Sequence, residues 1–254
     1  MSISYAFGDG AEAGDRLAVV HRVFAPLAER LLADAATSEP RAVVDLGCGP
    51  GHTTALLAAR WPHATVTAVE VSPAFAAAAR SRVPRATVLE GDVTDPDVLA
   101  VGRADLVYAR CLLAHLPDVG AAIATWRQWL APGGRLVLEE PERIDTDDAV
   151  FQRYLQVASS AVAARGATML AGSLVHAAVA NLDGVRIDRE VSHPVATTDA
   201  ATMFQLNLVT LRHDPAAGLD QKEAVELAAG LAARRSDPGT GAITWHVRQV
   251  VVGN

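Results

Sequence analysis

Residues 43–51 read VVDLGCGPG, and this stretch decides the fold of the chain. Its first four residues belong to a mostly apolar run, 41–46, whose β-branched residues are typical of a buried strand. Three glycines then follow at alternate positions, and glycine permits a tight turn and a close approach of the backbone to a ligand. Residues 53–60 have a helical pattern, so the glycines lie in a strand-to-helix turn, where a helix N-terminus offers unpaired N–H groups.

Strand-like and helix-like segments alternate beyond this turn. This alternation predicts an α/β fold, a doubly wound parallel sheet with helices on both faces. The expected strands are 41–46, 65–70, 86–90, 104–109 and 135–140, and the helices between them are 53–60, 74–82 and 119–130, the last closed by a turn at 131–134.

The two ends of the chain follow a different pattern. Residues 11–36 carry apolar side chains at steps of three and four, which predicts an amphipathic helix, so we expect an N-terminal helical cap over residues 1–40. The main domain then covers 41–254. After Pro141 we expect two helical inserts, near 141–182 and 199–236, separated by a strand at 185–191 and followed by one at 243–252.

Composition narrows the functional classes. The 254 residues are 50% hydrophobic and carry a net charge of −7, which suits a large core but not a nucleic-acid-binding face. The two cysteines form no CxxC pair, so we expect no metal site. No signal peptide or long apolar run is evident. We therefore expect a cytoplasmic protein that binds neither membrane nor nucleic acid.

The spacing of the glycines argues against a dinucleotide. A dinucleotide fingerprint, G-x-G-x-x-G, would place its third glycine at position 52, which is His52; the glycine lies at position 51 instead. The acidic Asp45 precedes the turn, and its carboxylate would repel a pyrophosphate but would suit a ligand with an ammonium group. These residues favour a cofactor that contains an amino acid.

Three further motifs follow in order along the chain. Glu70 ends the second expected strand, about 20 residues beyond Gly51, where an acidic residue accepts hydrogen bonds from ribose hydroxyls in related folds. Residues 91–93 read GDV, and a carboxylate followed by a free N–H can recognise an adenine edge. Residues 130–138, LAPGGRLVL, form a helix–turn–strand pattern.

Taken together, these four motifs resemble the class I S-adenosylmethionine-dependent methyltransferases over roughly residues 41–140. The resemblance implies a Rossmann-like sheet of seven strands whose last strand is antiparallel. It also implies S-adenosylmethionine as the cofactor and S-adenosylhomocysteine as the product. The loop containing Gly47 and Gly49 would pass under the methionine part, with Asp45 near its amino group. Glu70 would hold the ribose, and Arg110 would line the cofactor pocket.

The same resemblance assigns the remaining cofactor contacts. Val71 would lie against the adenine, while Asp92 and the Val93 N–H would meet its amine and a ring nitrogen. The N-terminal stretch YAFGD at 5–9 also looks like a small-molecule subgroup, in which Tyr5 and Arg16 would reach the cofactor. For Tyr5, simple packing on the domain remains an equal alternative.

We expect the reaction to be methyl transfer to a small, natural-product-like metabolite. His115 follows the fourth expected strand, where ligands sit in α/β sheets, and it is either a general base or a residue that shapes the loop. The helical inserts, rich in apolar residues, would form a lid over the acceptor. Two alternatives remain: cyclisation or rearrangement with a bound, non-reacting cofactor, and a non-catalytic binding module.

Overall fold

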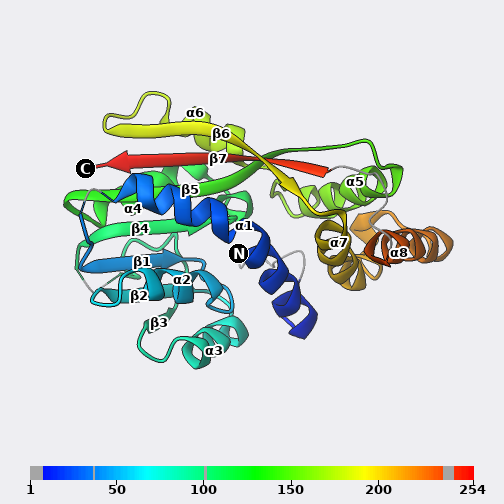
Figure 1. Ribbon diagram of the computed structural model, residues 1–254, viewed down its shortest axis with the longest axis horizontal. Helices are drawn as coiled ribbons and strands as arrows, with labels where there is room; N and C mark the ends of the chain where they lie inside the picture. Colours follow the sequence, from blue (N-terminus) through cyan, green and yellow to red (C-terminus); the bar gives the residue numbers. More distant parts are fainter. Residues whose placement is uncertain (1–7, 37, 100–101, 237–242) are drawn as a thin grey trace.

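A computed structural model describes residues 8–36, 38–99, 102–236 and 243–254. Its centre is a seven-stranded sheet with the order β3-β2-β1-β4-β5-β7-β6 (Figure 1). Strands β1 to β5 pair in parallel, and β7 is antiparallel to both of its neighbours. This arrangement confirms the predicted seven-stranded sheet with an antiparallel last strand. The strands are β1 (Ala42–Leu46), β2 (Thr65–Glu70), β3 (Thr87–Glu90), β4 (Ala104–Arg110), β5 (Leu130–Thr146), β6 (Val185–Val195) and β7 (Ile243–Gly253).

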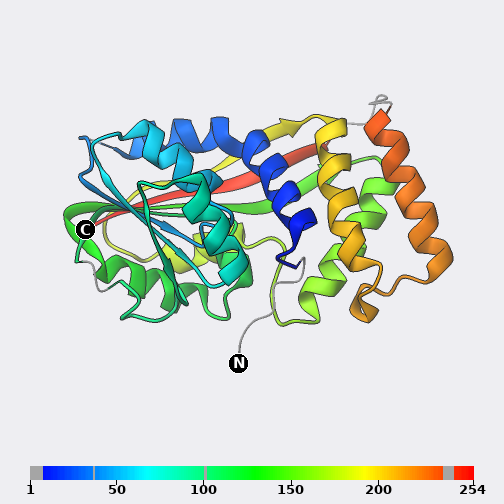
Figure 2. The same ribbon diagram turned by 90° about the horizontal axis from the view of Figure 1, so that it is seen from below.

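Helices cover both faces of the sheet, as the alternating pattern predicted (Figure 2). The first three pack on one face, and α4 and α6 share an apolar cluster on the other. The helices are α1 (Ala11–Ala35), α2 (His52–Arg60), α3 (Pro73–Arg82), α4 (Val119–Gln128), α5 (Ala149–Ala163), α6 (Gly172–Val179), α7 (Thr197–Leu211) and α8 (Gln221–Ser236), with two short 3-10 turns, η1 (Leu113–His115) and η2 (Pro215–Ala217). In the described part of the chain, no helix is both long and apolar enough to cross a membrane.

Strand β5 is much longer than the predicted 135–140. It runs beside β7 from Arg135, opposite Gly253, to Thr146, opposite Ile243, with an irregularity just after Pro141. A proline cannot donate to a strand ladder and is tolerated only at an edge or bulge. Here β4 ends opposite Glu139, so one side of β5 is already free at Pro141. The expected turn at 131–134 likewise lies within the irregular start of this strand.

The long strands carry a second apolar core beyond the sheet. Helices α5, α7 and α8 pack together at the far end of β5, β6 and β7 (Figures 1 and 2). Val23 and Phe24 of α1 join this cluster, whereas Leu31 and Leu32 join the cluster on the sheet, with Pro26 between the two pairs. The first expected insert is therefore divided: residues up to 146 extend β5, α5 belongs to the outer core, and α6 packs on the sheet beside α4.

Candidate active site

The chain leaves β1 at the point where the strand order reverses. From β1 it moves to β2 on one side, and later to β4 on the other. In open α/β sheets, ligands bind at the carboxyl ends of the strands at such a switch point. The glycine loop 47–51 lies between the end of β1 and the start of α2, so it occupies this position.

Two glycines of the loop have no room for a side chain. Gly47 has a φ of 60°, and a Cβ there would lie 2.6 Å from Cδ1 of Leu112. Gly51 has a φ of 84°, and its Cβ would lie 2.8 Å from Cα of Ala79 on α3. A left-handed backbone already favours glycine. The loop is thus pressed between α3 and the segment after β4.

Glu70 joins the glycine loop to the end of β2. One carboxylate oxygen accepts the N–H of Gly49 at 2.8 Å, and the other accepts the N–H of Ser72 at 2.8 Å. The side chain is buried, at 7% exposure. Hydrogen bonds to an ionised acceptor are among the stronger ones in proteins. Glu70 therefore fixes both loops relative to each other before any ligand arrives.

Asp45 is buried beneath the same loop. Its carboxylate accepts the hydroxyl of Thr54 at 2.6 Å. Burial raises the pKa of Asp45 to about 7, although Thr54 and the charge of Arg110 both oppose that rise. The carboxyl is therefore poised between its two protonation states, and a nearby positive charge would hold it ionised.

Arg110 ends β4 and reaches back toward the start of α2. Its Nη2 donates to the Thr53 hydroxyl at 3.0 Å and lies 3.3 Å from Nδ1 of His21. Its Nη1 is buried, and the described residues supply no hydrogen-bond partner for it. Buried polar groups in native proteins are nearly always paired. One side of this guanidinium is therefore available to a ligand.

Two histidines beside Arg110 were missed by the sequence interpretation. His21 of α1 stacks on His52 of α2, with ring centroids 5.4 Å apart. Burial, together with nearby arginines, lowers the pKa of each to about 4, so both rings are neutral at neutral pH. No local sequence signal connects the two positions, because they are far apart in the chain. His21 reaches the loop only because α1 packs beside α2.

The predicted adenine contacts lie farther along the same edge. Val71 is 63% exposed, directly after Glu70. One oxygen of Asp92 accepts both the N–H and the hydroxyl of Thr94, at 2.8 and 2.7 Å. Val93 is buried, and its carbonyl accepts the indole N–H of Trp126 at 2.9 Å. The hydrogen bonds of Asp92 with Thr94 and of Val93 with Trp126 hold the loop after β3 in one conformation.

The segment after β4 is held by a buried carboxylate. Cys111 adopts a φ of 52°, unusual for a residue other than glycine. One oxygen of Glu140 accepts the N–H groups of Leu112 and Leu113, at 2.7 and 2.8 Å, and burial raises the pKa of Glu140 to about 7. This contact fixes the short turn η1 that carries His115.

His115 itself lies in a poorly solvated environment. Burial, and then the charge of Arg16, lowers its pKa to about 4. Arg16 is a buried residue of α1, and its charge also acts on Cys111. Tyr5 lies outside the described residues. The structure thus brings Arg16 and His115 near each other.

The acidic residues in the second half of β5 have protein partners. Glu139 accepts the hydroxyl of Tyr108 and, at 2.9 Å, the amide of Gln249. Glu142 forms an ion pair with Arg248 at 2.8 Å. Arg143 pairs with Asp145 and Glu190. These contacts are structural, whereas the second oxygen of Glu140 is buried without a hydrogen-bond partner among the described residues.

Within the described ranges, no three histidine, cysteine, aspartate or glutamate side chains form a group that could hold a metal ion. The thiols are also poorly suited to chemistry. Burial raises the pKa of Cys48 well above its usual range and that of Cys111 to about 12. The titratable chemistry of this edge therefore depends on carboxylates, histidines and arginines.

Comparison with known proteins shows which proteins this chain resembles. Residues 43–134 match the family model of a methyltransferase domain. A trans-aconitate 2-methyltransferase of Methylobacterium radiotolerans is 39% identical over 150 residues, which are 59% of this chain and 56% of that relative. Another from an Enterobacter species is 38% identical over 130 residues, which are 50% of each chain. This chain thus matches only about half the length of these relatives.

Solved structures share the fold over nearly the whole chain. A putative sarcosine dimethylglycine methyltransferase from Galdieria sulphuraria has a TM-score of 0.55 at 14% identity, covering 91% of this chain and 85% of its own. A geranyl diphosphate C-methyltransferase from Streptomyces coelicolor has a TM-score of 0.57 at 15% identity, covering 99% and 88%. Residues 43–134 of this chain therefore match a methyltransferase domain, and the chain shares the fold of these methyltransferases.

Proposed function

We propose that the protein transfers a methyl group from S-adenosylmethionine to a small-molecule acceptor. The observation that carries this proposal is the cradle formed by the glycine loop 47–51 and Glu70, which is already held in place by two backbone hydrogen bonds. When bound, the cofactor supplies a methyl group made electrophilic by its positively charged sulfur. The protein's part is to orient the acceptor in line with that methyl and to exclude water.

Two buried groups fit the amino-acid end of the cofactor. The partnerless Nη1 of Arg110 is a donor of the kind that a carboxylate requires. Asp45, with a pKa of about 7, would be held ionised by an ammonium group, which we place near it through water. Gly47 and Gly49 would pass beneath this part of the ligand.

The adenosine end would lie toward β2 and β3. Each Glu70 oxygen accepts one backbone N–H and keeps a lone pair for a ribose hydroxyl. The exposed side chain of Val71 offers an apolar surface to the adenine. Asp92 and the Val93 N–H would recognise its edge. We retain Tyr5 and Arg16 as proposed contacts from the N-terminal region.

We place the acceptor beyond the carboxyl ends of β4 and β5. The turn η1 is tied to the segment between α5 and α6, because the N–H of Thr168 donates to the carbonyl of Ala114 at 3.1 Å. The helical inserts and the N-terminal half of α1 then lie over this end of the sheet (Figure 2). These contacts support the proposal that the inserts form a lid over the acceptor. Helices α5 and α7 lie nearer to α1 than α6 does.

His115 is the proposed general base for an acceptor that must lose a proton. Its low pKa keeps the imidazole neutral at neutral pH, which leaves a nitrogen able to accept a proton. A His115→Ala variant should then lose about 10²–10⁴-fold in turnover while retaining cofactor affinity. Turnover within a few-fold of the parent would show that His115 only shapes the loop.

The acceptor class has two candidates. The apolar composition of the helical inserts supports a natural-product-like acceptor. The matched relatives are named for trans-aconitate, a carboxylic acid. Buried Arg16, whose charge acts on His115, supports an anionic acceptor of that kind. A carboxylate needs no base, so His115→Ala would leave its methylation nearly unchanged.

A screen with methyl-labelled S-adenosylmethionine tests the proposal directly. The panel should contain trans-aconitate, other small carboxylic acids, and apolar phenols and amines. Methyl transfer predicts labelled product and S-adenosylhomocysteine in equal amounts. Product formed without S-adenosylhomocysteine would favour cyclisation or rearrangement with the cofactor as a bound element. Calorimetry should detect binding of S-adenosylhomocysteine, and tight binding of NAD in its place would refute the cofactor assignment.

A further inference from the structure

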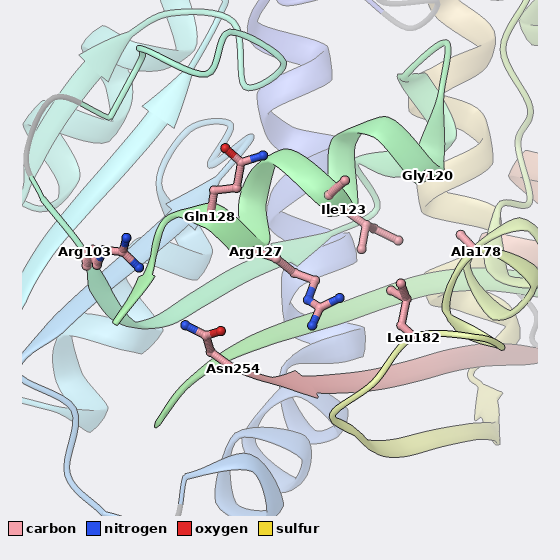
Figure 3. Close-up of a pocket in the computed structure, with 9 residues that line it drawn as sticks. Arg103, Gly120, Ile123, Arg127, Gln128, Ala178, Leu182 and Asn254 are labelled. Carbon is pink, nitrogen blue, oxygen red and sulfur yellow. The ribbon is translucent and has the colours of Figure 1, made fainter. Parts of the chain in front are cut away.

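A cavity of about 580 Å³ lies at the amino-end edge of the sheet, opposite the edge that holds the glycine loop. Its walls come from the residue before β4, from α4, from the end of α6, and from the last residue after β7 (Figure 3). This volume is within the range of small-molecule sites, roughly 300–1,000 Å³. The proposed methyl transfer makes no use of this cavity.

Two arginines reach into this cavity from different elements. Figure 3 shows Arg103 on one side of Asn254, and the guanidinium of Arg127 between Asn254 and Leu182. Within the described part of the chain, each guanidinium donates one hydrogen bond, to a backbone carbonyl: Arg103 to Leu130 at 3.2 Å, and Arg127 to Asp183 at 3.2 Å. A guanidinium has five N–H donors, so most donors of both groups remain for a ligand.

No carboxylate side chain of the described residues lies within 4.0 Å of either guanidinium. Elsewhere in the same part of the chain, arginines such as Arg234 and Arg248 pair with acids at 2.6 and 2.8 Å. In a chain whose net charge is −7, two arginines without an acidic partner at one cavity create a local positive potential.

The remaining wall of the cavity is apolar. Ile123 of α4 and Leu182, just beyond α6, line it together with alanine side chains. Figure 3 shows Leu182 and Ile123 on the opposite side of the space from Arg103. An inorganic anion would leave this wall unused, whereas an organic acid would contact both the guanidinium groups and the apolar surface.

We propose that this cavity binds a small organic carboxylate. Arg103 and Arg127, on different sides of the cavity, offer guanidinium donors whose planar fork matches the two oxygens of a carboxylate. The apolar part of the ligand lies on Leu182 and the alanine side chains of the wall. This site is separate from the cofactor edge and does not depend on the methyl transfer proposed above.

Calorimetric titration with benzoate tests the proposal. Benzyl alcohol serves as the uncharged ligand of matched shape, and inorganic phosphate serves as the simple anion. The parent protein is compared with Arg103→Gln, Arg127→Gln and a control, Arg85→Gln, which removes an exposed arginine that also donates to a carbonyl, at 2.9 Å. Excess S-adenosylhomocysteine is present throughout, and circular dichroism shows that each variant is folded.

Benzoate should bind saturably, each cavity variant should weaken it by about tenfold or more, and Arg85→Gln should leave its affinity unchanged. Benzyl alcohol and phosphate should bind much more weakly. Absence of saturable benzoate binding would overturn the proposal, as would unchanged affinity in both cavity variants. Equal binding of benzyl alcohol, or of phosphate, would show that the site does not select an organic carboxylate and would overturn it too.

Discussion

Gly51→Ala should destabilise the protein strongly, because two costs act at one position. The φ of 84° would force alanine into the left-handed region, at about 1–2 kcal/mol. The added Cβ would also lie 2.8 Å from Cα and 3.0 Å from Cβ of Ala79, so α3 must move. Overpacking of this kind costs about 1–3 kcal/mol. We expect a total loss of roughly 2–5 kcal/mol in the free energy of unfolding.

Gly133→Ala is the matched control for this change. Gly133 has a nearly equal φ of 79°, but no atom lies within 4 Å of the position where its Cβ would be. Only the backbone cost then applies, about 1–2 kcal/mol. Urea unfolding of the parent and both variants, with linear extrapolation to water, measures the difference.

The comparison separates the steric contact from backbone strain. A loss for Gly51→Ala no greater than that for Gly133→Ala would refute the close packing of the glycine loop on α3. Calorimetry with S-adenosylhomocysteine adds a second measurement. Because α3 begins at Pro73, close to Ser72 and Glu70, its displacement should also weaken cofactor binding, whereas Gly133→Ala should leave that affinity unchanged.

Further changes test other parts of the site. Glu70→Gln should cost about 1–3 kcal/mol of stability and weaken S-adenosylhomocysteine binding in calorimetry, because an amide cannot accept two N–H groups on separate oxygens; equal affinity would remove Glu70 from the site. Asp45 has a raised pKa of about 7, so its burial should make the free protein less stable as pH rises from about 4 to 7; Asp45→Asn should flatten that fall in urea melts. His52 has a lowered pKa of about 4, so stability should be lost as pH falls below about 6.5, and His52→Gln should reduce that loss. Tyr108→Phe should cost about 1–3 kcal/mol, since it removes a donor from buried Glu139; an unchanged urea midpoint would contradict this.

Sequence alone determined the class of fold and the place of the glycine loop within it. The glycine spacing at 47–51, Glu70 and the alternating strands depend on contacts between residues near in sequence: a turn, a helix start and a pleated period of two. Interactions between residues close together in the sequence therefore determine these features. The same reasoning placed α1 within one residue of its observed end.

Only the tertiary structure decided the length of β5 and the partners of the buried charges. Pro141 is compatible with a strand because β4 stops beside it and β7 pairs on the other side, a fact of sheet order. His21 reaches His52 and Arg110 because α1 folds back over α2. Such contacts join residues far apart in the chain, and burial acts on pKa only once those residues are packed; no local pattern encodes either effect.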